Sequence, residues 1–277
     1  MFNESIESKP PAVIADTLAR KVSVKKANMS LLHLMILGIF AGVYIGFGAG
    51  IATLVSSDLS KFVGVGLAKV ITGSVFSVGL MLVVIAGAEL FTGNNLMFMA
   101  ALDKKATYKQ VLHKWGIVYL ANFIGSVLLA YFMYKTELWK GKNFLTGVQA
   151  LKIANAKVNL TFGSAFFRAV LCNWLVCLAV WMSISSRNVI GKIFAIYFPI
   201  MTFVALGFEH CIANMYFIPY GIFLKCTGAA AASGLNLANL TWGGFIVNNL
   251  IPVTLGNVIG GVVPVAFLYW LVYVKEK

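Results

Sequence analysis

The stretch Gly87–Asn94, which reads GAELFTGN, recurs 120 residues later as Gly207–Asn214, which reads GFEHCIAN. Both follow the pattern G-x-E-x-x-x-x-N. A second pair lies further along in the same order, because Leu120–Leu128 (LANFIGSVL) and Leu255–Val263 (LGNVIGGVV) share five of nine residues at an offset of 135. Two matches in one order predict an internal repeat, with a longer loop around 227–241 in its second half.

The chain around these motifs is strongly apolar. Hydrophobic residues make up 60% of the 277 and charged residues 11%, whereas a soluble domain carries about a quarter charged residues. Three stretches hold no Asp, Glu, Lys or Arg, namely Ser30–Val55, Val70–Ala88 and Trp115–Tyr134. Each is close to the ~20 residues that cross hydrocarbon as a helix, and none alternates as a barrel strand does. The composition therefore predicts an all-α membrane protein.

The apolar runs predict six membrane spans, at about 30–55, 68–101, 114–135, 161–185, 191–224 and 243–274. The second and fifth runs are too long for one plain crossing. Each contains one G-x-E motif, so we expect both helices to be broken there. With three spans per half, the halves enter the membrane from opposite sides and form a 3+3 inverted repeat. In such folds the substrate path lies near the membrane midplane, where the broken helices meet.

Residues 1–28 are polar, and within them Pro11–Lys26 is suited to a helix with proline in its first turn. Its apolar residues recur at mostly three- and four-residue spacing, and its basic residues cluster toward the end. We expect a cytoplasmic amphipathic helix in 1–28 that lies on an anionic membrane face, ahead of a channel domain in 29–277. A disordered tail is the alternative.

The net charge of +13 does not indicate a nucleic-acid partner, because the basic residues sit mostly at the edges of apolar spans. At those edges they face the lipid bilayer and set topology. With both termini inside, the inner side holds thirteen Lys and Arg and the outer side eight. This bias predicts a multi-pass protein of the cytoplasmic (inner) membrane with both termini cytoplasmic. The N-terminus lacks the basic segment and apolar run of a signal peptide.

No pattern in the sequence predicts a metal or a cofactor. The four cysteines fall in or beside apolar spans without a tight metal-ligand spacing: Cys172, Cys177, Cys211 and Cys226. We interpret them as small packing residues.

Glu89 and Glu209 are the only acidic residues inside the apolar spans. A charge at the centre of a membrane helix costs roughly 2.5–3.5 kcal/mol on insertion scales, so its presence at both repeat positions suggests a role. We expect each glutamate to support its helix break by capping free backbone N–H groups. Asn214 and Asn257, which belong to the repeated motifs, are grouped with them as support; proton carriage by the glutamates is the alternative.

His210 lies in the second break, where its repeat mate at offset 120 is the apolar Leu90. A histidine can change charge near neutral pH, so His210 is a candidate proton carrier. Half-helix N-termini at the midplane, together with Lys157 on the outer side, would attract anions. Thr92, Asn173 and Asn257 would add neutral polar groups, although each alone is more often a helix–helix hydrogen-bond partner.

Four segments of the chain resemble the formate/nitrite transporter family: Gly87–Thr92 (GAELFT), Asn173–Met182 (NWLVCLAVWM), Gly207–Asn214 (GFEHCIAN) and Pro252–Gly261 (PVTLGNVIGG). The likeness extends over nearly all of 29–274. It implies a homopentamer of six-span protomers with an aquaporin-like fold, each protomer with its own pore. The N-terminal helix would then gate the inner mouth.

The resemblance also implies a substrate path. The first broken helix of the chain would form a loop that carries Leu90, Phe91 and Thr92. Apolar constrictions would map to Leu80 and Leu90 on the inner side, and to Phe76 and Phe203 on the outer side. His210 would be the central histidine, with Thr92 and Asn173 nearby, and Lys157 the outer lysine.

The sequence thus predicts a channel for small monovalent anions of weak acids, coupled to protons through His210, with no catalytic residues. Formate is the first expectation, and nitrite, hydrosulfide and lactate follow. Phe166–Arg168 resembles nitrite-type members, whereas Asn249–Pro252 resembles formate channels. A neutral-solute pore of the aquaporin kind is the alternative from another class, although such pores carry an Asn-Pro-Ala pair at their breaks. An intramembrane enzyme is disfavoured, because no convincing catalytic set is found.

Overall fold

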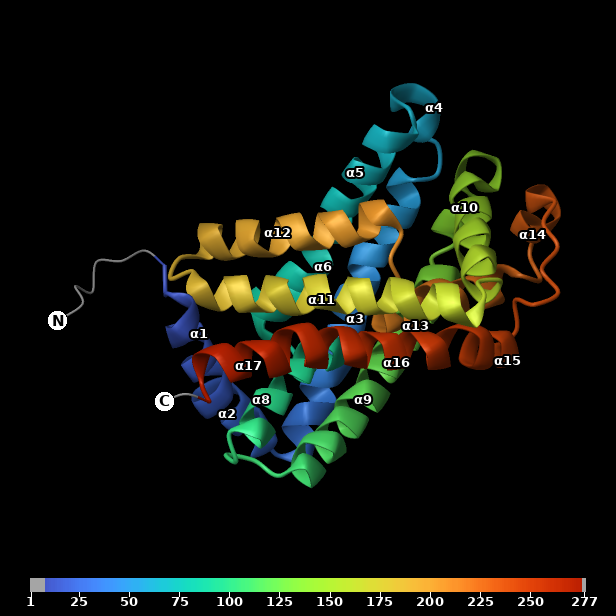
Figure 1. The fold of residues 1–277 in the computed structure, drawn as a ribbon. Helices are drawn as coiled ribbons and strands as arrows, with labels where there is room; N and C mark the ends of the chain where they lie inside the picture. The colour runs from blue at the N-terminus through green and yellow to red at the C-terminus, as the bar shows by residue number, and fades with distance from the viewer. Residues whose placement is uncertain (1–7, 276–277) are drawn as a thin grey trace.

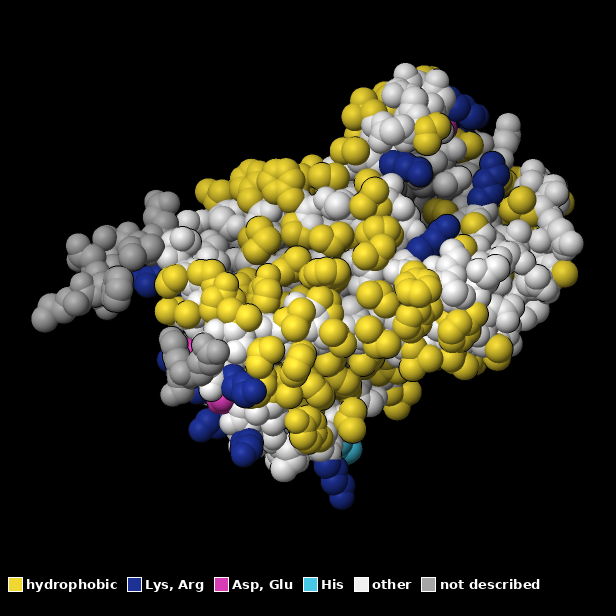
Figure 2. Space-filling view, viewed as in Figure 1, with side chains coloured by type: hydrophobic (Ala, Val, Ile, Leu, Met, Phe, Trp, Pro, Cys, Tyr) yellow, Lys and Arg dark blue, Asp and Glu magenta, His cyan; other side chains and the backbone are white. Residues whose placement is uncertain are grey.

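The computed structural model describes residues 8–275, and within them every regular element is helical (Figure 1). Six helical segments are long and apolar enough to cross a membrane: Leu31–Val55, Val65–Gly87, Tyr108–Lys135, Phe162–Ser185, Val189–Leu206 and Trp242–Tyr273. Hydrophobic side chains cover the middle of the molecule over α11, α12 and α16, while Lys and Arg gather toward its two ends (Figure 2). The predicted all-α fold with six spans is confirmed.

The first half contains one plain span, one broken span and a second plain span. Its elements are α3 (Leu31–Val55), α4 (Ser60–Val63), α5 (Val65–Phe76), α6 (Val78–Met81), the π-helical η2 (Leu82–Gly87), α7 (Phe91–Asn94), the 3₁₀ turn η3 (Asn95–Met97), α8 (Phe98–Leu102) and α9 (Tyr108–Lys135). The second span therefore breaks between η2 and α7, at the motif that contains Glu89.

The second half repeats this order after a connecting helix, α10. Its elements are the 3₁₀ turn η4 (Leu138–Lys140), α10 (Gly141–Val158), α11 (Phe162–Ser185), α12 (Val189–Leu206), α13 (Cys211–Leu224), α14 (Gly228–Ser233), α15 (Trp242–Gly244), the π-helical η5 (Phe245–Leu250), α16 (Ile251–Gly261), the π-helical η6 (Val262–Phe267) and α17 (Leu268–Tyr273). The fifth span breaks between α12 and α13, as the second G-x-E motif predicts.

Each break begins at a glycine with a positive φ angle, +95° at Gly87 and +77° at Gly207. Side-chain-bearing residues rarely adopt this backbone region, so glycine lets the chain leave the helix sharply. The first residues after each turn run beside the first span of their own half. Glu89 N–H donates to Leu37 O at 3.1 Å, and Glu209 N–H donates to Arg168 O at 3.4 Å.

The N-terminal helix consists of α1 (Pro11–Thr17), the π-helical η1 (Leu18–Val22) and α2 (Ser23–Ala27). Its apolar face is buried, with Ile14, Ala15, Leu18 and Ala19 all at most 3% exposed. It packs against α17 and the region of α8 (Figure 1). The helix was predicted correctly, but the expectation that its apolar face lies on the membrane was wrong, because that face packs on the protein.

The order of elements in the two halves also matches at their starts. The N-terminal helix precedes α3 as α10 precedes α11, and each of these spans begins at a hydroxyl cap, Ser30 or Thr161. The repeat therefore extends beyond the three spans per half that the sequence predicts, since each half also carries a preceding amphipathic helix.

Candidate functional site

Two asparagines hold the two helix breaks in the same way. Asn122 Oδ1 accepts the Phe91 N–H at 2.9 Å, and Asn122 Nδ2 donates to Glu89 O at 2.9 Å and to Gly38 O at 2.8 Å. Asn122 is fully buried. Its side chain thus satisfies backbone groups on both sides of the break that would otherwise have no partner in the membrane interior.

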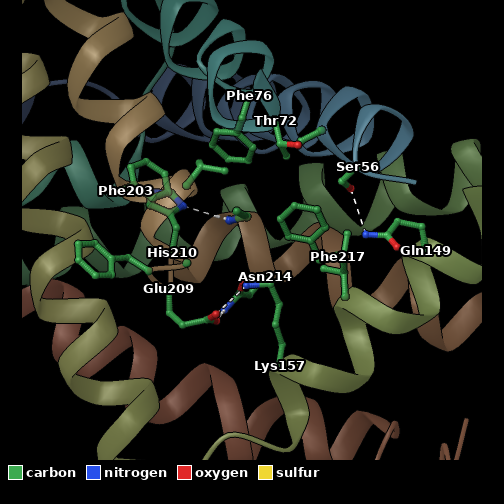
Figure 3. Close-up of a pocket in the computed structure, with 16 residues that line it drawn as sticks. Ser56, Thr72, Phe76, Gln149, Lys157, Phe203, Glu209, His210, Asn214 and Phe217 are labelled. Atoms are coloured by element: carbon green, nitrogen blue, oxygen red, sulfur yellow. Dashed lines mark hydrogen bonds and ion pairs between the residues drawn. The ribbon is translucent and has the colours of Figure 1, made fainter. Parts of the chain in front are cut away.

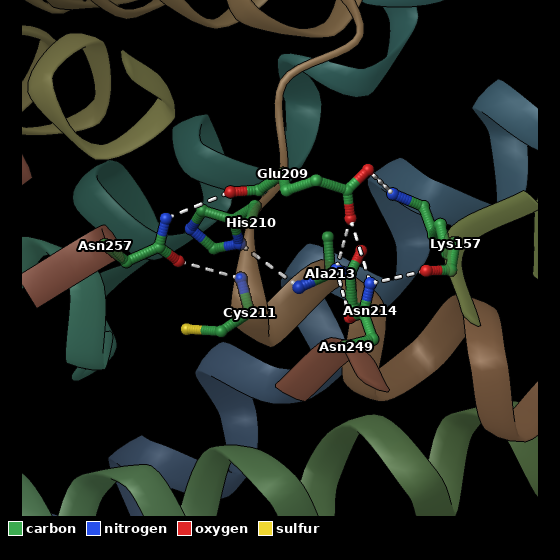
Figure 4. Close-up of polar contacts among 8 residues, drawn as sticks. All are labelled: Lys157, Glu209, His210, Cys211, Ala213, Asn214, Asn249 and Asn257. Carbon is green, nitrogen blue, oxygen red and sulfur yellow. Dashed lines mark hydrogen bonds and ion pairs between the residues drawn. The ribbon is translucent and has the colours of Figure 1, made fainter. Parts of the chain in front are cut away.

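Asn257 repeats this arrangement in the second half. Its Oδ1 accepts the Cys211 N–H at 2.9 Å, and its Nδ2 donates to Glu209 O at 2.9 Å (Figure 4). The same Nδ2 also donates to Ala169 O at 2.8 Å. Asparagines, and not glutamates, therefore satisfy the first backbone N–H group after each break.

The two glutamates instead bind side chains, so the expectation that they cap backbone N–H groups was wrong. The Glu89 carboxylate lies 2.8 Å from Lys26 Nζ and accepts from Asn94 Nδ2 at 2.8 Å. Lys26 Nζ also donates to Asn94 Oδ1 at 2.7 Å. The Glu89 side chain is 7% exposed, and a carboxylate buried to this degree needs such a cation and donor.

The second half has the matching ion pair. Glu209 Oε1 lies 2.8 Å from Lys157 Nζ, and Glu209 Oε2 accepts from Asn214 Nδ2 at 2.7 Å. Asn249 Nδ2 donates to Lys157 O at 3.0 Å and Asn249 Oδ1 accepts from Asn214 at 2.7 Å, which completes the cluster (Figure 4). One lysine–glutamate pair therefore stands beside each helix break.

His210 connects the two breaks. Its Nδ1 accepts the Ala213 N–H at 3.1 Å, while its Nε2 lies 2.9 Å from Thr92 Oγ1 on the other broken helix. Because Nδ1 acts as an acceptor, the proton of the neutral ring resides on Nε2 and is donated to Thr92. His210 is 3% exposed and Thr92 fully buried.

Asn173 lies behind this contact. Its Nδ2 donates to Thr92 O at 3.3 Å, to Asn257 O at 2.7 Å and to Asn95 Oδ1 at 2.7 Å. Asn173 therefore links the first broken helix and α16 to α11, and it holds the backbone of Thr92.

A cavity of about 260 Å³ opens above His210, and we name it the outer cavity because the distribution of Lys and Arg in the sequence predicts that this side faces outward. Phe76 and Phe203 project from one side of it and Lys157 from the opposite side (Figure 3). Gln149 Nε2 donates to Ser56 Oγ at 3.1 Å across its rim.

A second cavity of about 500 Å³ lies on the side of the N-terminal helix, and we name it the inner cavity because the sequence predicts that this side faces the cytoplasm. It is lined by Lys26, Glu89, Leu80, Leu90 and Asn94, among others. Each cavity thus holds one lysine–glutamate pair.

Between the cavities the path narrows to a void of about 10 Å³, which is at the lower limit of the space that one water molecule needs. Its lining is apolar except for one histidine: Ile45, Phe76, Leu80, Leu90, Val176, Ile200, Phe203 and His210. The Phe76 and Phe203 rings pack edge to face, with their ring centroids 5.7 Å apart. The residues that the resemblance assigns to constrictions therefore lie around one waist.

Other predicted site residues lie away from these spaces. The Phe91 ring lines none of the three and packs at 4.9 Å from the Tyr119 ring on the opposite side of its loop. Thr92 and Asn173 lie behind His210, and Asn257 holds the second break.

Sequence reasoning missed four residues of the site: Lys26, Asn94, Asn122 and Asn249. Two of these carried a usable signal. Asn94 and Asn122 are the repeat mates of Asn214 and Asn257, at offsets of 120 and 135. The sequence around Lys26 and Asn249 gave no such indication.

The chain is similar to known proteins over almost its whole length. Residues 14–271 match the family model described as formate/nitrite transporter. The chain is 42% identical to a probable formate transporter of Methanothermobacter thermautotrophicus, over 97% of this chain and 98% of that protein. It is 38% identical to formate channel FocA of Escherichia coli (strain K12), over 96% of this chain and 95% of that protein.

Two solved structures share the fold. One, described as a pentameric formate channel with formate bound, has a TM-score of 0.79 and 39% identity, covering 91% of this chain and 99% of that one. The other, an FNT family ion channel, has a TM-score of 0.79 and 28% identity, covering 95% of this chain and 98% of that one. These relatives are channels and transporters, which confirms the prediction of a membrane transport protein and not an enzyme. The chain belongs to the formate/nitrite transporter family.

Proposed function

We propose that the chain forms a homopentameric channel that passes formate across the cytoplasmic membrane, with both termini in the cytoplasm. Relatives named as formate channels or transporters, and a similar solved pentamer with formate bound, support this substrate and assembly. The observation that carries the proposal is the placement of His210, the one titratable side chain at an apolar waist between two cavities that each hold a lysine.

The two cavities serve to collect the anion. Lys157 in the outer cavity and Lys26 in the inner one supply positive charge, and each is held by a glutamate at 2.8 Å. The pairing keeps the local net charge small, so the anion is attracted without being trapped. The side-chain amides add polar contacts to each pair: Asn94 accepts from Lys26, and Asn214 donates to Glu209.

The waist cannot pass a bare anion cheaply. Phe76, Phe203, Leu80 and Leu90 offer no hydrogen bond to replace the lost water, and an ion removed from water costs far more than a neutral solute of the same size. Formate that takes up one proton becomes neutral formic acid, which avoids most of this cost. The acid releases its proton to water in the cavity on the other side.

His210 mediates the protonation through Nε2, whose proton is donated to Thr92 beside the waist. A neutral ring that gave up its Nε2 proton would become an imidazolate, so the ring must first gain a proton at Nδ1. Nδ1 accepts the Ala213 N–H, and the ring therefore has to release that contact as it is protonated from the outer cavity. The doubly protonated ring then gives its Nε2 proton to formate and becomes neutral with its remaining proton on Nδ1. Uptake of a proton at Nε2 and release of the one at Nδ1 restore the ring that accepts the Ala213 N–H.

The test is uptake into liposomes that contain the purified protein, with formate, acetate, nitrite, hydrosulfide, lactate and chloride at two external pH values. We expect formate to pass fastest and its flux to rise as external pH falls. A His210→Asn channel should lose the pH dependence and leave only an anionic leak. Unchanged pH-dependent formate flux in that variant would overturn the role of His210.

Two alternatives give different results in the same assay. Faster nitrite or hydrosulfide than formate would keep the mechanism and change the substrate. Swelling with water or glycerol in the absence of anion flux would indicate a neutral-solute pore, and would overturn the proposal.

A further inference from the structure

An apolar pocket of about 470 Å³ lies on the outside of the molecule, apart from the pore cavities. It is formed by α9 and by the last span from η5 to α16, with Trp115, Gly116, Tyr119, Ile251 and Thr254 among its lining residues. The Phe91 ring forms part of its wall. An added Cβ on Gly116 would meet nothing within 4 Å, so the absence of a side chain there leaves the pocket open.

The depth of the pocket follows from the symmetry of the fold. Trp115 and Leu250, Gly116 and Ile251, and Tyr119 and Thr254 are repeat mates at an offset of 135. Tyr119 and Thr254 also touch each other, with their hydroxyl oxygens 2.8 Å apart. Repeat mates meet only at the pseudo-two-fold axis, and in an inverted repeat that axis lies in the membrane plane. The pocket is therefore at the level of the bilayer centre.

The chemistry of the lining restricts the occupant. Three polar side-chain groups occur among the described lining residues: the hydroxyls of Tyr119 and Thr254, which bond each other, and the Trp115 indole N–H, which donates to Asn94 O at 2.8 Å. A polar ligand would find few groups there to replace the hydrogen bonds that it makes to water. The rim continues into exposed apolar side chains, with Leu120 at 55% and Leu255 at 51%. A hydrocarbon occupant meets every one of these conditions.

We propose that this pocket holds one hydrocarbon chain of a membrane phospholipid at the bilayer centre. The chain lies beside Gly116 and rests on the Phe91 ring. Phe91 sits between Leu90, which lines the waist, and Thr92, which contacts His210. The acyl chain thereby supports the first broken helix from outside the pore. The inference concerns the pocket alone and does not depend on which anion is carried.

Photolabelling tests the occupant directly. The full-length protein is placed in liposomes that contain a tracer phospholipid with a diazirine in the middle of one acyl chain, and labelled residues are mapped by mass spectrometry. We expect strong labelling of Trp115 and Ile251 and a several-fold loss of it in Gly116→Leu. Leu128, which is 40% exposed on the same helix, serves as an internal reference and should be labelled equally in both proteins.

Three further results bear on the proposal. Gly116→Ala, which fills little of the pocket, should keep most of the labelling, and Ile251→Trp replaces Gly116→Leu if that variant does not assemble. Labelling of Trp115 no stronger than that of the core residue Val118 would mean that a neighbouring subunit covers the pocket, and would overturn the proposal. Equal labelling of Trp115 in wild type and both filled variants would overturn it as well.

Discussion

Asn122 and Asn257, which are 135 residues apart, make the same three hydrogen bonds to two equivalent helix breaks. Each accepts the first N–H of the second half-helix and donates to the carbonyl of the break glutamate and to the first span of its own half. Both are fully buried. The two breaks are thus separate copies of one device, and each copy is held by its own half of the chain.

Replacing either asparagine by alanine should therefore destabilise the protein by a similar amount. Each buried backbone group left without a partner costs about 1–3 kcal/mol. We expect Asn122→Ala and Asn257→Ala to lower the thermal unfolding temperature of the purified protein clearly, with Asn236→Ala, at an exposed loop position, as the control. If Asn257→Ala unfolds at the same temperature as the wild type, the Asn257 amide does not hold the break.

Variants of the Lys157–Glu209 pair can separate the effect of the Lys157 charge on formate uptake from its effect on the stability of the protein. The two side chains are 14% and 4% exposed, and removing one partner of a buried pair costs about 3–5 kcal/mol because the other charge is left alone. Lys157→Met should therefore lower both thermal stability and formate uptake. The double variant Lys157→Met with Glu209→Gln should recover much of the stability while uptake stays low.

One outcome of comparing the single and double variants would contradict a role of Lys157 in attracting the anion. If the double variant also recovers formate uptake, Lys157 serves only to neutralise Glu209 and does not attract the anion. The pair Lys26 and Glu89 provides a matched set at the other cavity, where Lys26 is 25% exposed and the loss of stability should be smaller.

The breaks themselves could be predicted from sequence, because the features that cause them are local. A glycine and a glutamate inside a run too long for one helix mark both positions, and the recurrence of the motif places them in equivalent halves. Gly87 and Gly207 indeed adopt positive φ angles. His210 was a prediction from the same motif, since it replaces an apolar residue at the repeat position.

The partners of the glutamates could not be predicted in this way. Lys26 lies 63 residues from Glu89 and belongs to a segment whose apolar spacing is typical of a helix on a membrane surface. Only the packing of that helix on the end of the bundle brings the two charges together. Asn122 could have been found, because its repeat mate Asn257 was already a candidate and the repeat applies equally to both.

Widening the waist should weaken its selectivity. Leu80 and Leu90 both line the void of about 10 Å³ between the cavities. In Leu90→Ala the void grows and admits water, so an anion no longer needs to become neutral. We expect measurable chloride flux and a weaker dependence of formate flux on pH in liposomes. Leu128→Ala, at an exposed position of α9, should behave as wild type, and an unchanged Leu90→Ala channel would place the barrier elsewhere.

Thr92 should control how His210 presents its proton. Thr92 Oγ1 lies 2.9 Å from His210 Nε2, while the Ala213 N–H fixes the opposite nitrogen of the ring. In Thr92→Val the shape of the side chain is kept but the Nε2–H loses its acceptor, so the ring is no longer held in one orientation at the waist. We expect slower formate uptake with the pH dependence shifted, and restoration by Thr92→Ser, which returns the hydroxyl. A purely structural role for Thr92 would lower thermal stability in Thr92→Val and leave the shape of the pH profile unchanged. Uptake measured against external pH for the three proteins therefore distinguishes a proton-orienting hydroxyl from a packing residue.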